Sequence, residues 1–403
     1  MGDCKAVLHG LLIDGQGGEP LPDSAVLIRD KRIEAVGSAD ELDVPDDAEI
    51  IDAGGKTVLP GIIEGHAHVG GNAAAQKVLR VSLQRGITTV CSVSLNPHGL
   101  PLRDGIESGD VRGCARLIGG SIVTCTNGHV KHRTADGPWE VRKAIREMVM
   151  AGSDFIKTAA SGGFVGQHEQ CSSPNYTPEE LNALTDEAHA WDVPVVVHCH
   201  TQPGLGYCID AGVDQIHHGA FIDEAAVRGI KEKDLYYMPT LAVTCNRNIK
   251  ALADQPWQTK EMKESQPIHR EGVRLAHELG VKLAVGTDYP GTARTWRIGD
   301  RTLYELQELV SCGLTPMEAI VAATRNNAHA YRRLDDLGTI EPGKRADLLV
   351  VTGNPAEDVS ILYEAGNINL VMKDGVVEST DEAHKQYYRV CEDQPANRRN
   401  AVE

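Results

Sequence analysis

Residues 58–68 read VLPGIIEGHAH, an apolar run that ends in two histidines separated by one residue. The run Val58 to Ile63 is apolar on both faces, as in a strand of a parallel sheet that is covered on both sides. Side chains two residues apart on a strand point the same way, so the imidazoles of His66 and His68 can face one ion. This stretch predicts a buried parallel strand with a pair of metal-ligand histidines at its end.

Seven further apolar runs share this character and alternate with helical stretches. They are Thr88 to Val93, Arg116 to Ile122, Asp154 to Thr158, Val193 to Cys199, Gln215 to His218, Leu235 to Leu241 and Lys282 to Asp288. Between the fourth and fifth runs, Thr177 and Glu180 form a capping box, followed by a predicted buried face of Leu181, Leu184, Ala188 and Trp191. Eight β/α units over about 280 residues fit an α/β fold of the (β/α)8 TIM-barrel type better than an open sheet. We expect this barrel over residues 58–339.

The two ends of the chain have a different pattern, of short two-sided strands joined by turns. It occurs over residues 7–37 and again at Ala346 to Val351 and Ile368 to Val377. Such a pattern is typical of hairpins. We expect residues 1–57 and 340–380 to share one small β-domain and residues 381–403 to form a polar tail.

Composition argues against several classes of partner. The chain has 403 residues and a formal net charge of −17, which repels nucleic-acid phosphates and anionic membrane surfaces. No apolar run approaches the ~20 residues of a spanning helix, and the start has no cationic segment followed by an apolar one, so we expect neither a signal peptide nor an anchor. Ten cysteines without a C-x-x-C pair suggest reduced thiols and a cytoplasmic location. The expected partner is a small-molecule substrate, with no nucleic acid and no membrane.

Potential metal ligands gather at the ends of the predicted strands, where a barrel of this type has its active site. They are His66, His68, Lys157, His198, His218 and Asp288. Taken singly, Lys157 has a simpler explanation as an ion-pair lysine and Asp288 as a helix cap. Because the six fall at successive strand ends, we interpret them as one metal site.

Lys157 is the unusual member of this set, because an ammonium repels cations and its free pKa is about 10.4. A neutral amine that has taken up carbon dioxide becomes a carbamate, whose two oxygens can bridge cations roughly 3.5 to 4 Å apart. In this interpretation His198 and His218 serve the second ion, while Asp288 holds the first and handles a proton. Adjacent strand residues face opposite ways, so only one of His217 and His218 should enter the barrel mouth, and Cys199 should pack behind its strand.

Together these motifs resemble the amidohydrolase superfamily over nearly the whole chain. The resemblance is carried by Val58 to His68, the strand ends at Lys157 and Asp288, and the closing stretches Leu314 to Ile320 and Leu337 to Leu348. Within that superfamily the chain is most similar to the imidazolonepropionase-like, Xaa-Pro dipeptidase (prolidase) branch with a carboxylated lysine. That similarity rests on Gly119 to His129, Lys157 to Gly163 and Gly212 to Gly219.

The resemblance implies a metal-dependent barrel, a small β-sandwich built from both termini and a homo-oligomer. It assigns His198 and His218 as ligands on the fifth and sixth strands, and His129 as a contact of the substrate carbonyl. We also expect His200 to bind substrate. Two departures from the family pattern stand out: His217 replaces a usually acidic residue, and the loop after Lys157 carries Phe164, Gln167, His168, Glu169 and Cys171. These departures leave open whether dipeptide specificity is inherited with the fold.

The expected activity is hydrolysis of an amide, peptide (dipeptide or N-acyl amino acid) or carbamate C–N bond, with Asp288 and His129 as catalytic residues. Two divalent ions are expected; zinc suits the ligands best, and manganese, cobalt or iron also fit. The alternatives are a deaminase with one metal, a cyclic amide or lactone hydrolase, and a non-catalytic relative of the same barrel. Specificity should come from the loops at residues 164–176, 244–266 and 289–301. In the last, Arg294, Trp296 and Arg297 would meet either a substrate group or another subunit.

Overall fold

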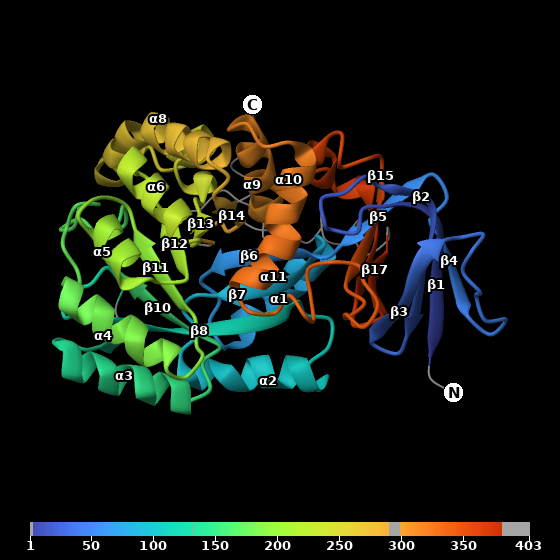
Figure 1. Cartoon of the computed structure of the whole chain (residues 1–403), viewed down its shortest axis with the longest axis horizontal. Helices are drawn as coiled ribbons and strands as arrows, with labels where there is room; N and C mark the ends of the chain where they lie inside the picture. The colour runs from blue at the N-terminus through green and yellow to red at the C-terminus, as the bar shows by residue number, and fades with distance from the viewer. Residues whose placement is uncertain (1–2, 131, 290–298, 381–403) are drawn as a thin grey trace.

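The structure is a computed structural model that describes residues 3–130, 132–289 and 299–380. One sheet is built from both ends of the chain, and it lies to one side of a barrel (Figure 1). Its strand order is β17-β16-β15-β5-β1-β2-β3, with β4 beside β1. The strands are β1 (Cys4–Leu12), β2 (Leu21–Arg29), β3 (Arg32–Ser38), β4 (Glu49–Asp52), β5 (Lys56–Pro60), β15 (Leu348–Thr352), β16 (Ile368–Lys373) and β17 (Val376–Thr380).

The second sheet is parallel and has the order β14-β13-β12-β11-β10-β8-β7-β6, with the short β9 beside β8. Its strands are β6 (Ile62–Ala67), β7 (Ile87–Ser92), β8 (Arg116–Thr124), β9 (Arg133–Thr134), β10 (Phe155–Ala159), β11 (Val195–Cys199), β12 (Gln215–His218), β13 (Tyr236–Met238) and β14 (Lys282–Leu283). The Gly65 amide donates to the Val285 carbonyl at 3.0 Å, and the Asp288 amide donates to the His66 carbonyl at 2.7 Å. These bonds join the first strand to the segment after the last and close the barrel, as the sequence predicted.

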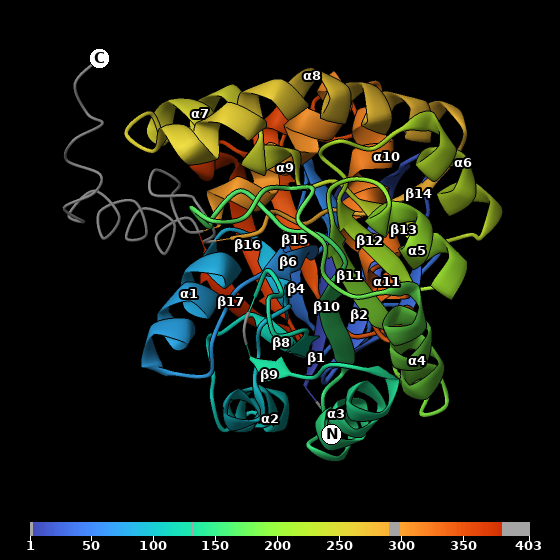
Figure 2. The same cartoon turned by 90° about the vertical axis from the view of Figure 1, so that its left-hand side faces the viewer.

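Helices surround the barrel strands (Figure 2). They are α1 (Ala73–Gln84), α2 (Leu100–Ser108), α3 (Pro138–Met150), α4 (Pro178–His189), α5 (Gly204–Ala211), α6 (Glu224–Glu232), α7 (Asn246–Ala251), α8 (Pro256–Glu278), α9 (Asp300–Ser311), α10 (Pro316–Val321) and α11 (Asn327–Ala330). The capping box predicted for α4 is present at Thr177 and Glu180. Trp191, expected on its buried face, lies beyond the end of this helix and is 52% exposed. Within the described ranges, no helix combines the length and the apolar character that crossing a membrane requires.

The apolar run at residues 58–63 does not form one barrel strand as predicted. It divides at Gly61 between β5, which pairs with β15 and β1 in the first sheet, and β6, which begins the barrel. Val58 packs in the core of the first sheet, whereas Ile62 packs in the core between the barrel and its helices. Because both environments are apolar, the sequence pattern could not separate them. The barrel strand begins at Ile62 rather than Val58.

Candidate metal and active site

Two histidines and one aspartate meet where the first and last barrel strands are joined. Nε2 of His68 lies 2.9 Å from Oδ1 of Asp288, and Nε2 of His66 lies 3.4 Å from the same oxygen. Burial lowers the pKa of His66 to about 3, so its ring is neutral at pH 7, the form that binds metal ions. Burial alone would raise the pKa of Asp288, but its interactions with His66 and His68 hold it well below its usual range. The ligand atoms lie within 4.8 Å of one another and could hold a metal ion.

A buried carboxyl group fixes these segments to each other. Oε1 of Glu64 accepts from the amides of His66 at 2.8 Å and Thr287 at 2.9 Å. Its Oε2 accepts from the hydroxyls of Thr287 at 2.9 Å and Thr302 at 2.6 Å. Burial raises the pKa of Glu64 to about 7. Sequence reasoning assigned this residue no role, although an acidic residue within an apolar strand was a signal for one.

Lys157 lies in β10 and is 2% exposed. Among the described residues, its Nζ has no hydrogen-bond partner. Burial lowers its pKa to about 7, and a charge on Lys157 would in turn lower the pKa of His66 and His198. A large fraction of this amine is therefore neutral near pH 7, as the addition of carbon dioxide requires.

Three more imidazoles, from the ends of β11 and β12, complete a cluster of rings. The ring centroids of His198 and His218 lie 4.4 Å apart, and that of His200 lies 4.6 Å from His198. The ring of His218 also lies 4.8 Å from that of His66. Burial holds the pKa of all three well below the usual range. Nε2 of His198 is 3.1 Å from the Gly162 carbonyl, and Nδ1 of His218 is 2.8 Å from the Thr240 hydroxyl.

Both His217 and His218 reach the ring of His66, so the prediction that only one would enter the barrel mouth was wrong. Nδ1 of His217 lies 2.7 Å from Nδ1 of His66, and its Nε2 lies 3.0 Å from Oε1 of Gln215. His218 ends the strand with a φ of +78°. This left-handed conformation breaks the alternation of an extended strand. His217 thus occupies one nitrogen of His66 and leaves the other for Asp288. Cys199 packs against Gly204 of α5, behind its strand, as expected.

His129 comes from the loop after β8. Its ring stacks on that of His198 with centroids 4.0 Å apart, and its Nδ1 lies 2.9 and 3.0 Å from the two carboxylate oxygens of Glu169. Burial would raise the pKa of Glu169, but the hydrogen bond from His129 lowers it overall. Sequence analysis noted Glu169 as a departure from the family pattern and did not find this contact.

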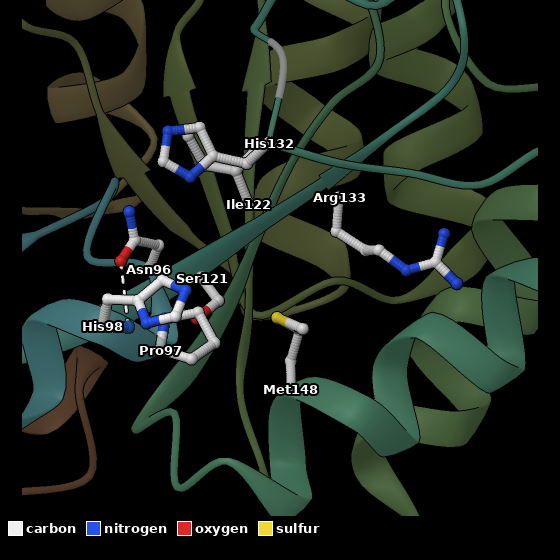
Figure 3. A pocket seen from close by; sticks show the side chains of 8 residues that line it. All are labelled: Asn96, Pro97, His98, Ser121, Ile122, His132, Arg133 and Met148. Carbon is white, nitrogen blue, oxygen red and sulfur yellow. Dashed lines mark hydrogen bonds between the residues drawn. The ribbon is translucent and has the colours of Figure 1, made fainter.

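A pocket of about 410 Å³ opens between the loop after β7, β8 and α3 (Figure 3). Its lining residues are Asn96, Pro97, His98, Ser121, Ile122, His132, Arg133 and Met148. None of the predicted site residues lines it. Arg294, Trp296 and Arg297, and the predicted tail at residues 381–403, lie outside the described residues.

A closed barrel with imidazoles and a carboxylate at the carboxyl ends of its strands defines a barrel hydrolase with a potential metal site. Residues 57–377 match the amidohydrolase family, and the chain belongs to this family. The ochratoxinase of Aspergillus niger is 28% identical over 92% of this chain and 85% of its own length.

Among solved structures, a Xaa-Pro dipeptidase with methionine bound in its active site superposes with a TM-score of 0.83 at 29% identity, over 93% of this chain and 99% of that one. A prolidase complexed with N-methylphosphonate-L-proline superposes with a TM-score of 0.84 at 27% identity, with the same two coverages. The chain is therefore a hydrolase of the amidohydrolase family, and its relatives support amide-bond hydrolysis.

Proposed function

We propose that this chain is a binuclear metal-dependent hydrolase that cleaves an amide, peptide or carbamate C–N bond and carries a carboxylated Lys157. The observation that carries the proposal is the amine of Lys157, which is 2% exposed and has no hydrogen-bond partner among the described residues. A buried ammonium without a partner is costly. Carbon dioxide on the neutral amine would replace that cation with an anion suited to metal ions.

The donor set fits two divalent cations. His66, His68 and Asp288 would hold the first, His198 and His218 the second, and the carbamate on Lys157 both. Imidazole and carboxylate donors of this kind suit zinc. When bound, such ions supply a water whose pKa falls from about 15.7 toward about 7, and they polarise the substrate carbonyl.

Asp288 is the proton carrier of this proposal. Its low pKa keeps the carboxylate ionised at neutral pH, and His68 fixes its Oδ1 at 2.9 Å. Asp288 would accept the proton of the attacking water and deliver it to the leaving nitrogen, as a general base and then a general acid.

Two further imidazoles would contact the substrate. His129 has a nitrogen, Nε2, that bonds no described residue and would meet the carbonyl oxygen as it gains charge. Nδ1 of His200 is buried and has no hydrogen-bond partner among the described residues, which leaves it for a polar group of the substrate.

The test combines metal content, carbamate detection and a substrate panel. The protein would be loaded with zinc and 13C-bicarbonate, analysed for metal and for a carbamate 13C signal, and assayed on N-acyl amino acids, dipeptides, carbamates, ureas and lactones. Two ions per chain, one carbamate signal and hydrolysis of a C–N bond are expected. Lys157→Met should lose the signal, whereas Lys143→Met, at a two-thirds exposed lysine of α3, should keep it. One ion per chain with ammonia release from an aminated ring would contradict the proposal and indicate a deaminase.

A further inference from the structure

Several described residues fix the position of His129. One face stacks on His198 at 4.0 Å with an angle of 19° between the rings. The backbone of Gly163 lies so close that a Cβ there would be 2.3 Å from Cε1 of His129, so only glycine allows this approach. The His129 amide donates to Oδ1 of Asn175 at 2.9 Å. A ring packed in this way is fixed in position, but packing alone does not decide which nitrogen carries the proton.

Glu169 determines which nitrogen of His129 carries the proton. Both of its carboxylate oxygens lie within 3.0 Å of Nδ1 of His129. The carboxylate is itself held by the amides of Gly166 at 3.0 Å and Gly163 at 3.4 Å. A carboxylate accepts and cannot donate, so Nδ1 must carry a hydrogen.

We propose that Glu169 is a positioning residue, which acts through His129 and fixes the orientation of the ring that would contact the substrate. The inference rests on the proposed function of the site. It assigns a role to the loop after β10, which departs from the family pattern in sequence.

The same loop also supports the second imidazole proposed to contact substrate. The ring of Phe164 lies 4.7 Å from that of His200. Phe164 is buried in a small apolar cluster with Cys171 of the same loop and with residues of α7 and α8. One loop therefore braces both His129, by a hydrogen bond, and His200, by ring contact.

Glu169→Gln and Glu169→Ala separate the two contributions of this carboxylate. The amide keeps an acceptor for Nδ1 but removes the charge, whereas alanine removes both. In the zinc-loaded protein, on the best N-acyl amino acid or dipeptide of the panel, kcat should fall about 10-fold for Gln and about 100-fold for Ala, with KM changed less than kcat. The control is His168→Ala, at an exposed neighbour with no hydrogen bond among the described residues, and it should keep the wild-type kcat.

The second readout does not depend on activity. Histidine-selective 15N NMR, with the His129 signal assigned through His129→Asn, should show a protonated Nδ1 in the wild type and a mixture of tautomers in Glu169→Ala. Unchanged tautomer populations, or an unchanged kcat in Glu169→Ala on a substrate that the wild type hydrolyses, would overturn the inference. Should the wild type hydrolyse nothing in the panel, the proposed function fails, and the NMR result alone decides whether Glu169 fixes the ring.

Discussion

Two buried basic residues on neighbouring barrel strands have opposite surroundings. Arg116 begins β8 and is 1% exposed, and its Nη2 lies 2.8 Å from Oδ1 of Asp374 and 3.1 Å from Oδ2 of Asp347. Lys157 lies within β10 and is 2% exposed, and its amine has no hydrogen-bond partner among the described residues. Two carboxylates pair with Arg116, whereas no carboxylate among the described residues lies within ion-pair distance of the Lys157 amine.

The difference separates structure from function within one barrel. Arg116 joins the amino-terminal end of a barrel strand to the residue before β15 and to the turn after β16, so its ion pairs hold the barrel against the first sheet. Lys157 sits among imidazoles whose pKa values are lowered by burial. Perturbed groups of this kind concentrate where proteins bind ligands or catalyse reactions. A buried charge that the fold leaves unpaired marks the place where a ligand is expected.

The largest effect is expected from Asp288→Asn. An amide cannot carry the proton from water to the leaving nitrogen, so kcat should fall about 10⁴-fold. His129→Asn should cost only about 10²-fold, because it removes a donor to the oxyanion and leaves the proton carrier in place. Both are measured as kcat at matched metal content. Near-normal turnover by Asp288→Asn with its metal bound would show that another group carries the proton.

Arg116→Met tests the paired cation. Removing one partner of a buried ion pair leaves Asp347 and Asp374 without their common cation, so the free energy of unfolding should fall by about 3 to 5 kcal/mol. Arg116→Lys should fall between this variant and the wild type, because an ammonium restores the charge but not the planar fork. Urea unfolding measures both, and kcat of the folded variants should stay at the wild-type value. If the free energy of unfolding falls by less than about 1 kcal/mol, the ion pairs of Arg116 do not stabilise the fold and the comparison with Lys157 fails.

Much of the fold could be predicted because it depends on apolar periodicity. All eight predicted barrel strands have counterparts in the sheet, and both ends of the chain build the other sheet. The boundary at Val58 was wrong because one apolar run serves two cores. The prediction that Trp191 lies on the buried face of α4 was wrong because a helical pattern does not show where the helix ends. The first error depends on contacts between segments that are distant in sequence, and the second on where a helix ends.

The metal ligands of the candidate site were easier to predict than the residues that hold them in place. Spacing brought out His66, His68 and Asp288, and the structure places these three together. The partners that fix them come from elsewhere in the chain: Thr302 reaches Glu64 from α9, and Glu169 reaches His129 from a different loop. The prediction from strand alternation failed at His218 because its φ is positive, which the sequence alone does not reveal.

Lys157→Met tests the unpaired amine in the same comparison. In protein purified without metal, replacing an unpaired buried amine by an apolar chain of similar length should leave stability unchanged or raise it by up to about 2 kcal/mol. Hydrolysis should be lost in the same variant, because the bridging group is gone. The measurements are urea unfolding of the metal-free protein and kcat after zinc loading. A destabilisation like that of Arg116→Met would mean that the chain satisfies this amine after all.

The smallest effect is expected from Asp214→Asn. Asp214 is a further charged group that finds its partners within the chain. Asp214 accepts from the Val195 amide at 2.7 Å and from Nε2 of His189 at 2.8 Å. Burial would raise its pKa, but these hydrogen bonds and the charge of Arg332 lower it overall. A carboxyl whose pKa is lower in the folded than in the unfolded chain stabilises the fold above its unfolded pKa, about 3.9. That stabilisation is lost as the pH falls through the folded pKa. Asp214→Asn should therefore cost about 1 kcal/mol at pH 7.

This cost should shrink as the pH falls below about 4, because the wild-type carboxyl then becomes protonated as well. Urea unfolding at pH 7 and at several values below pH 4 measures the difference between the two proteins. Asp210→Asn, at an exposed aspartate of α5, is the matched control and should change little at any pH. A cost for Asp214→Asn that stays constant as the pH falls would show that the loss comes from packing rather than charge. In that case Asp214 would not belong with Arg116 among the charges that the chain pairs for stability.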